Sequence, residues 1–257
     1  LIGRAKGKIY FDKFREQIST FINRELNELK RHRVESLDAH DLVDQKIIES
    51  KVTGDRVNHT IIVLDHTDNI LTNAIDMETG IRGFLLTGLQ EFLEPYEIGR
   101  RTFGANLKTL TKKVSDNPAQ VARLEEIRKI IDIWVKTMVE PAIKLRHQVN
   151  DGSKNLNDIN EEALLKKGKV IFDTFRSQVS IFKKVENTLL QTRLNEDDVT
   201  NRIAAGNLDI ITLNEEKVHF SNKVIRSATT LLTSAVDMET GMRGYLLAGD
   251  ESFLEPY

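Results

Sequence analysis

The stretch DMETGIRGFLLTG occupies Asp76–Gly88, and DMETGMRGYLLAG occupies Asp237–Gly249. In both places the letters FLEPY follow a few residues later. Apolar residues in and before each phrase recur at helical spacing, and a glycine just past them is a typical helix stop. The phrase therefore predicts a long helix that ends at a corner and leads into a second helix.

The phrase belongs to a repeat that spans most of the chain. A shift of 161 positions aligns the sequence with itself without a gap, and 15 of 21 residues are identical between 76–96 and 237–257. A second block reads GKIYFDKFREQISTF at Gly7–Phe21 and GKVIFDTFRSQVSIF at Gly168–Phe182. A period of this length indicates a repeated domain rather than a short solenoid unit.

Two glycines lie inside each phrase, Gly80 with Gly83 and Gly241 with Gly244. A glycine in a helix interior is about 1 kcal/mol less favourable than an alanine. Because both copies keep both glycines, we expect a neighbouring backbone to pack closely against this face.

The charged residues of the phrase are the candidate functional residues. Glu78 and Arg82 are four residues apart, acid first, so they can pair on one helix face. We expect some of these charges to be partly buried near the bundle seam, with partners on a later helix. The candidates are Asp76, Glu78, Thr79, Arg82, Asp173 and Arg176, and Asp237, Glu239, Thr240 and Arg243 in the second copy. Two interpretations stay open: a polar cavity that binds a ligand or switches packing, or a salt-bridge network that sets bundle register.

Composition favours a helical, well-solvated chain. Of 257 residues, 40% are apolar and 30% are charged, and there are four prolines and no cysteine. A formal net charge of −2 gives no reason to expect nucleic acid or an anionic membrane as a partner. The absence of cysteine excludes disulfides and thiolate chemistry. No apolar run reaches the roughly 20 residues that span a bilayer, and no signal peptide is visible.

One period contains four helical patterns. The first carries Ile61, Leu64, Leu71, Ile75 and Leu85, the second Phe103, Leu107, Leu110 and Val114, the third Val121, Leu124, Ile127, Ile131, Trp134 and Met138, and the fourth Leu165, Phe172, Phe175, Val179, Phe182, Leu189 and Leu190. Gly88 and Gly249 supply the left-handed stop, and Asp250 is a natural N-cap that Leu89 cannot be.

Further signals mark the ends of these helices. Asn117 reads as an N-cap, with Pro118 at the first helical position and Gln120 in capping-box register. Pro141 should kink the third helix. Asn150–Asp158 is a polar loop, and the fourth helix should end near Asn195, although the joins at 34–58 and 197–217 can themselves be helical.

Four amphipathic helices joined by short loops predict an all-α, antiparallel up-and-down four-helix bundle. We expect residues 1–44 to be the last helix and linker of a preceding unit, 45–206 a complete unit, and 207–257 the first helix and start of the second helix of a following unit. Because the two end fragments carry unpartnered apolar stripes, we expect them to pair with each other, with the central bundle, or with another copy.

No catalytic, metal or cofactor site is predicted. The six histidines are scattered, no HExxH occurs, and His59 with His66 most simply lie on an exposed or seam face. No Ser-His-Asp order or nucleophile elbow appears. Gly168-Lys169 lacks the Walker pattern and preceding strand of a phosphate loop. We therefore expect a protein that is not an enzyme.

Taken together, DMETGxRGFLLTG…FLEPY, then NPAQ, then GKxxFDxFRxQ…F…E…LL resembles the CHASE-type extracytoplasmic sensory domains, specifically the third, all-helical class. The resemblance covers about Asn58–Asn195 and both flanking fragments. It adds Gly168, Lys169 and Glu186 to the signature positions. Two departures are Leu89, where the second copy has Asp250, and His32, where the later copy has Arg193.

The resemblance implies the input domain of a bacterial transmembrane receptor, such as a histidine kinase, a cyclase-type enzyme or a chemoreceptor. It implies a periplasmic or extracellular location, anchoring through segments outside this chain, a homodimer, and an unknown small-molecule or protein signal. Tandem units depart from the usual single domain between two membrane helices. The alternative hypothesis is a structural array of bundles that acts as a spacer, scaffold or oligomerisation module.

Overall fold

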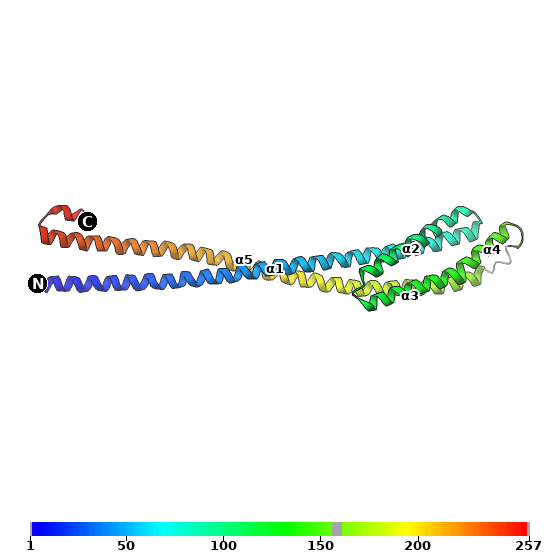
Figure 1. Ribbon diagram of the computed structural model, residues 1–257, viewed down its shortest axis with the longest axis horizontal. Coiled ribbons are helices and arrows are strands. Elements are labelled where there is room, and N and C mark those ends of the chain that lie inside the picture. The colour runs from blue at the N-terminus through cyan, green and yellow to red at the C-terminus, as the bar shows by residue number, and fades with distance from the viewer. Residues whose placement is uncertain (1, 156–160, 256–257) are drawn as a thin grey trace. The chain divides into compact units, whose positions relative to one another are not determined.

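The computed structural model describes residues 2–155 and 161–255, and no strand occurs within those ranges. Its elements are α1 (Ile2–Thr87), the 3₁₀ turn η1 (Gln90–Phe92), α2 (Leu93–Lys113), α3 (Pro118–Trp134), the π-helical turn η2 (Val135–Val139), α4 (Glu140–Asn150), α5 (Glu161–Ala248) and the 3₁₀ turn η4 (Glu251–Leu254) (Figure 1). The predicted all-α class is confirmed. The end of the predicted polar loop, residues 156–158, and the second-copy Pro256 and Tyr257 lie outside the described residues.

The chain divides into two units. The central unit is Lys51–Asp197, and the terminal unit combines Leu1–Ser50 with Asp198–Tyr257. In the central unit the second part of α1, α2, the α3–α4 segment and the first part of α5 lie alongside one another (Figure 1). This arrangement is the predicted four-helix bundle. No helix within the described ranges has an apolar stretch long enough to cross a bilayer.

The core of the central unit is mainly apolar. Its buried residues on α1 are Val63, Ile70, Ala74, Met77, Ile81 and Phe84. With the buried Thr67 they are spaced alternately four and three residues apart, which makes a seam that faces the other three helices. The predicted stripe on this helix was wrong in register: Ile61 and Ile75 are exposed, while Leu71 and Leu85 pack at the edge of the core.

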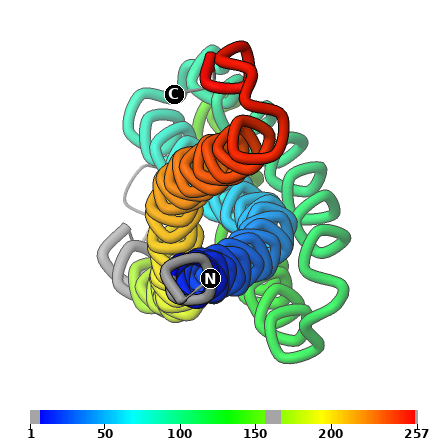
Figure 2. The backbone as a smooth tube through the Cα atoms, turned by 90° about the vertical axis from the view of Figure 1, so that its left-hand side faces the viewer, coloured from blue at the N-terminus to red at the C-terminus, as the bar shows by residue number. Residues whose placement is uncertain are grey.

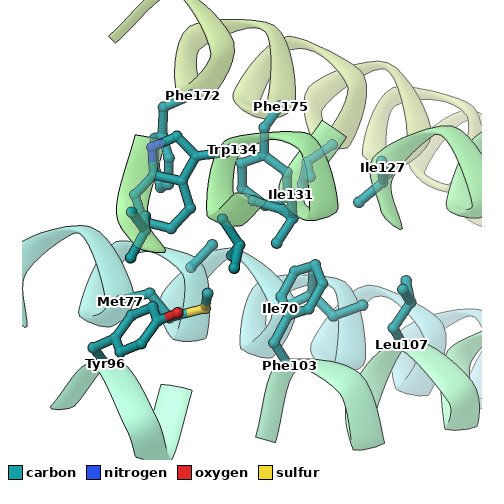
Figure 3. Close-up of a cluster of buried hydrophobic side chains, with 14 of the residues drawn as sticks. Ile70, Met77, Tyr96, Phe103, Leu107, Ile127, Ile131, Trp134, Phe172 and Phe175 are labelled. Atoms are coloured by element: carbon teal, nitrogen blue, oxygen red, sulfur yellow. The ribbon is translucent and has the colours of Figure 1, made fainter. Parts of the chain in front are cut away.

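Aromatic side chains fill the middle of this core. Trp134 meets Phe172 edge-on with ring centroids 5.5 Å apart, and Phe172 lies 5.4 Å from Phe175. Phe103 of α2 lies 6.1 Å from Phe175, so rings from three helices interlock (Figure 3). Aromatic pairs in such tilted geometry add about 0.5–1.5 kcal/mol beyond their area burial.

The third helix is interrupted rather than simply bent at Pro141. A proline cannot donate to the carbonyl four residues earlier and its ring crowds that carbonyl, and the π-helical turn η2 directly precedes it. A π turn adds one residue, so the buried face shifts by one position. Buried residues before the turn are Leu124, Ile127, Ile131 and Trp134. Within it they are Val135, Met138 and Val139, and after it Ala142 and Arg146, while Pro141 is exposed.

The predicted corners are confirmed. Gly88 and Gly249 have φ of 73° and 70°, the left-handed region that favours glycine. The Asp250 side chain accepts a hydrogen bond from the Ser252 backbone N–H, whereas Leu89 provides no side-chain cap. At the start of α3, Asn117 accepts from the Gln120 N–H, with Pro118 at the first helical position.

Gln120 does not close a capping box, which corrects that prediction. Its side chain is fully buried, and its Nε2 donates to Glu186 Oε1 at 2.5 Å. Arg123 Nη1 donates to Gln120 Oε1 at 2.8 Å. Because the Glu186 side chain is itself buried, it needs a donor, and Gln120 serves the core instead of the helix end.

The last predicted helix boundary was also wrong. α5 does not end near Asn195 but continues to Ala248, and α1 likewise runs through 34–58. Both joins are therefore helical. Only a single glycine interrupts each join, and an isolated glycine inside a helix is tolerated.

The two end fragments pair with each other in the terminal unit (Figure 2). Ala39 and Val43 of α1 pack with Ile211 of α5 in a small buried cluster. His32 Nδ1 lies 3.2 Å from Asn214 Oδ1, and both side chains are buried. Of the three partners expected for these apolar stripes, the structure shows the first.

The Asp250 cap makes the second corner sensitive to pH. The Ser252 backbone N–H holds the pKa of Asp250 below its ordinary value. Since the folded pKa is lowered, the cap stabilises the corner above the unfolded pKa of about 4 and is lost as pH falls through the lowered value. We expect the protection factor of the Ser252 amide, its exchange rate compared with the intrinsic rate at the same pH, to fall at low pH, measured by NMR hydrogen exchange.

Two comparisons control this experiment. The Asp250→Asn variant keeps a capping oxygen and should lose the pH dependence. The Gly88 corner, with Leu89 in the capping position, should show none of this titration. Equal protection of the Ser252 amide in wild type and Asp250→Ala at neutral pH would contradict the role of the cap.

Candidate functional site

The glycines of the first phrase lie where α1 meets the start of α2. A Cβ added at Gly80 would lie 2.8 Å from the Tyr96 backbone nitrogen and 2.9 Å from the Phe92 carbonyl oxygen. One added at Gly83 would lie 2.5 Å from Phe92 Cδ1. Gly99 of α2 faces back, with its Cβ position 2.7 Å from the Asn73 carbonyl oxygen. Glycine on both helices therefore permits a close backbone contact.

The second phrase builds the same corner. A Cβ at Gly244 would collide with the Phe253 ring, as one at Gly83 would with Phe92 one period earlier. Gly241, the counterpart of Gly80, is buried.

The charges of the first phrase lie outside the core. Asp76, Thr79 and Arg82 are exposed, and Glu78 is half-buried. Glu78 does not pair with Arg82; its Oε2 lies 3.1 Å from Arg176 Nη2 on α5. The apolar face of the bundle, not a charged layer, fills the interior at this level.

Arg176 connects several features of this surface. It also lies 3.5 Å from Asp173 on its own helix, and its guanidinium stacks 4.7 Å from the centroid of the Phe172 ring. Asp173 is exposed. The sequence named both residues as partners of the phrase, and the structure brings Arg176 to Glu78.

The second phrase repeats this pairing. Glu239 forms ion pairs with Arg15 of α1 and with Arg243 four residues later. Arg15, the equivalent of Arg176, stacks 4.8 Å from the Phe11 ring centroid. Asp237, Thr240 and Arg243 are exposed.

A groove of about 220 Å³ opens beside the first phrase, and we call it the signature groove. It is lined by Glu78, Ile81, Arg82 and Leu85 of α1, Trp134 of α3, Met138 and Val139 of η2, Ala142 of α4, and Gly168 and Lys169 of α5. Its walls are mainly apolar, and one acid and two cations stand among them. Three chain segments thus converge on one small site.

The groove unites the two repeated blocks of the sequence. Glu78 and Arg82 belong to the repeated DMETG phrase, and Gly168 and Lys169 belong to the repeated block that begins with Gly-Lys. The Gly168 Cβ position lies 3.7 Å from the Trp134 indole nitrogen, so a larger residue there would cover the indole edge. Within the described ranges neither Arg82 nor Lys169 has an ion-pair partner.

Sequence reasoning missed the floor of the groove. Trp134 and Met138 were assigned to the core, and the π-helical turn between them was not foreseen. Such turns occur often at functional sites, and Pro141 was the available signal. A larger hollow of about 1000 Å³ between α2 and α3 contains none of the signature charges, so we take the signature groove as the candidate site.

A buried cation lies at the corner next to the groove. Arg146 is 6% exposed, and its Nε and Nη1 have no hydrogen-bond acceptor. Its Nη2 lies 2.5 Å from the point where Gly88 would carry a Cβ, so glycine is required there for space as well as for φ. The carbonyl end of α1 favours a cation at this place.

No group of three or more His, Asp and Glu residues able to hold a metal ion occurs among the described residues. His59 Nε2 lies 3.0 Å from the Lys113 carbonyl oxygen, a backbone contact that holds the end of α2.

The chain is similar to a known domain family and to a solved sensor domain. The profile of the CHASE3 domain matches residues 53–196 and again 214–257. A solved structure, the sensor domain of the Rhodopseudomonas palustris histidine kinase HK9, is 24% identical, with a TM-score of 0.41, and the match covers 51% of this chain and 97% of that one. No curated protein matches the chain. Since the family profile accounts for more than half of the residues, in one long and one shorter match, the chain belongs to the CHASE3 domain family of sensory domains.

Proposed function

We propose that this chain is the extracytoplasmic input domain of a bacterial membrane-bound receptor, a histidine kinase or a chemoreceptor. It is not itself catalytic; it is anchored through segments outside this chain and works as a homodimer. The CHASE3 family supports the sensory role. The anchoring and the dimer rest on the resemblance.

We further propose that the stimulus acts in the signature groove. One observation carries this proposal: both repeated sequence blocks contribute to one small cavity whose remaining walls are apolar. Ligand sites typically combine apolar walls with a few placed polar groups. Arg82 and Lys169 offer positive charge without an ion-pair partner among the described residues, so a small organic anion with an apolar body is the ligand class that fits.

Binding there would change helix packing through weak links. The Glu78–Arg176 pair joins α1 to α5, and both side chains are partly exposed. Exposed pairs of this kind contribute about 0–1 kcal/mol. A bound ligand can therefore break the Glu78–Arg176 pair at little cost in free energy. α5 is one uninterrupted helix from Glu161 to Ala248, so a shift at its first turns has a continuous path. The ligand must bind one packing more tightly than the other.

The test is calorimetry with hexanoate and cyclohexanecarboxylate, compared with hexanamide and cyclohexanecarboxamide. We expect the carboxylates to bind and the amides to bind at least tenfold more weakly. The Arg82→Gln and Lys169→Gln variants should each weaken carboxylate binding by about 10- to 100-fold, the value of a charge-assisted hydrogen bond.

The repeat supplies a matched control. Arg243 is the counterpart of Arg82 in the terminal unit, and Arg243→Gln should leave binding unchanged. Absence of carboxylate binding, or equal binding by the Arg82→Gln/Lys169→Gln double variant, would contradict an anion site. If receptor output is also unaltered in that double variant, a spacer or scaffold role is favoured over sensing.

A further inference from the structure

We propose that a groove between α2 and α3 of the central unit binds a free fatty acid, with the alkyl chain in the groove and the carboxylate at its rim. The groove has a volume of about 1000 Å³, and we call it the α2–α3 groove. Among the described residues, none lines both this groove and the signature groove. The proposal therefore does not depend on ligand binding in the signature groove.

The floor of the α2–α3 groove is apolar and belongs to the core of the central unit. It consists of side chains that are at most 5% exposed: Met77, Phe103, Leu107, Leu124, Ile131 and Val135. Figure 3 shows that Met77, Phe103 and Ile131 come from three different helices of the core cluster. Since Met77 belongs to α1, the groove passes between α2 and α3 and reaches a third helix.

The depth of the groove fits an alkyl chain better than a helix of a partner protein. Packed helices lie roughly 8–10 Å apart, axis to axis, and a helix with its side chains is itself roughly 10–12 Å wide. A partner helix can therefore cover the rim but cannot reach Met77 between α2 and α3, whereas an unbranched alkyl chain can. Contact of such a chain with the apolar floor removes apolar surface of both from water.

Small residues leave room in the walls of the groove. Gly104 on α2 and Ala122 on α3 both line the groove, and both are exposed. No atom lies within 4 Å of the position of a Cβ on Gly104, whereas a Cβ on Gly80 or Gly99 would meet backbone atoms at 2.8 or 2.7 Å. Gly104 therefore does not serve a close helix contact, and the space beside it is open to a ligand.

The unpaired charge on the rim of the groove is positive. Lys108 and Lys112 lie four residues apart on the α2 side and are exposed. Neither lysine has an ion-pair partner among the residues that the structure describes. On the α3 side, Arg128 pairs with both Glu125 and Asp132, so these three charges largely satisfy one another. The rim is thus complementary to an anionic head group.

The positions of the two lysines set the direction of the bound chain. Lys108 and Lys112 lie in the half of α2 that is nearer to the loop before α3. Arg100, towards the other end of the groove, is paired with Glu140. We therefore place the carboxylate at the lysines, where water also reaches it, and the alkyl chain along the floor towards Met77 and Val135.

Two methionines distinguish this groove from the signature groove. Met77 lines the α2–α3 groove, and Met138 lines the signature groove. The experiment is methyl NMR of the ¹³C-methionine-labelled chain titrated with decanoate below its micelle concentration. It uses the Arg82→Gln/Lys169→Gln background, so that the signature groove does not compete for the anion. We expect the Met77 signal to shift until it saturates and the Met138 signal to stay unchanged.

The length and charge of the ligand test the two halves of the proposed site. From hexanoate to decanoate, affinity should rise up to about fourfold for each added methylene, because each one buries more apolar surface. Decyltrimethylammonium should bind about tenfold more weakly than decanoate, because both lysines repel its charge.

Variants of the rim test the role of the lysines. The Lys108→Gln/Lys112→Gln variant should weaken decanoate binding about three- to tenfold, the value of two exposed ion pairs, and leave decan-1-ol binding unchanged. Lys136→Gln is the matched control, since Lys136 is exposed on η2 and lines neither groove.

A variant that fills the groove tests the site without changing its charge. Gly104→Leu should weaken decanoate binding by about tenfold or more, because the ligand then has to displace the new side chain. The variant should stay folded, since no atom lies within 4 Å of the Cβ position and leucine favours a helix more than glycine does. Ala105→Leu, at the next and exposed residue outside the groove, should bind decanoate normally.

Four results would overturn the proposal. The first is a shift of Met138 without a shift of Met77. The second is equal binding of decanoate and decyltrimethylammonium, and the third is unchanged decanoate binding by Gly104→Leu. The fourth is a Met77 signal that depends on protein concentration without ligand, since a second copy of the chain would then occupy the groove. None of these results bears on whether hexanoate binds in the signature groove of the wild-type chain.

Discussion

Replacing Phe182 with alanine is expected to lower the free energy of unfolding of the central unit by about 3–5 kcal/mol. Phe182 is fully buried in the core cluster, so the change removes apolar burial and leaves a cavity that a close-packed interior cannot refill. Trp134 is the sole tryptophan and lies in the same core. Its fluorescence during urea unfolding therefore reports on this unit.

The matched control is Phe21→Ala at the equivalent position of the terminal unit. Because the Phe21 side chain is 43% exposed, the expected loss in helix stability, followed by circular dichroism, is about 1 kcal/mol or less. The Trp134 transition should not move. If Phe21→Ala costs as much as Phe182→Ala, the terminal face is already covered in solution and the difference in burial described above is incorrect.

Replacing Gly80 with alanine is expected to destabilise the central unit by about 1–3 kcal/mol, the usual effect of overpacking. The new Cβ would meet the Tyr96 nitrogen and the Phe92 carbonyl oxygen. Both are backbone atoms, so α2 must move away as a whole, and the gain in helix propensity does not compensate. The urea midpoint of Trp134 fluorescence measures this effect.

Gly104→Ala on α2 is the control for helix propensity alone. Nothing lies within 4 Å of its Cβ position, so the variant should be stabilised by about 1 kcal/mol. A Gly80→Ala variant that is stabilised to the same extent would show that α1 and α2 do not pack as closely as described.

The helices, their corners and the repeat were predictable from the sequence. The Gly88 stop, the Asn117 cap with Pro118, and the Asp250 cap all depend on contacts within four residues. Local backbone physics decides such features, so the structure agrees with the prediction at each of them. The two repeated blocks were also sufficient to indicate the family, because their spacing reflects one bundle.

The candidate site was predictable only in part. The sequence identified Glu78, Arg82 and Arg176 as candidates, but it predicted the pair Glu78–Arg82, whereas Glu78 contacts Arg176. Both pairings satisfy the carboxylate, and only the distance between α1 and α5 selects one of them. The groove itself needs Trp134 and Met138, which periodicity assigns to the core.

Tertiary structure decided which face of α1 is buried, whereas predicted core positions of the other helices, such as Phe103 and Phe175, are buried as expected. α1 has apolar residues on both sides of its seam, and the small Ala74 is buried while the neighbouring Ile75 is exposed, so the apolar pattern fits more than one register. The extra residue before Pro141 then shifts the buried face of the third helix. Gln120 leaves its expected cap because the buried Glu186 requires a donor.

The sequence by itself determined helix, corner and repeat, since hydrogen bonds and dihedral preferences within a few residues are enough for them. The buried face of α1 and the Glu78–Arg176 pair were decided by the packing of distant helices. Those contacts depend on which surfaces meet in space, and a local pattern does not contain that information.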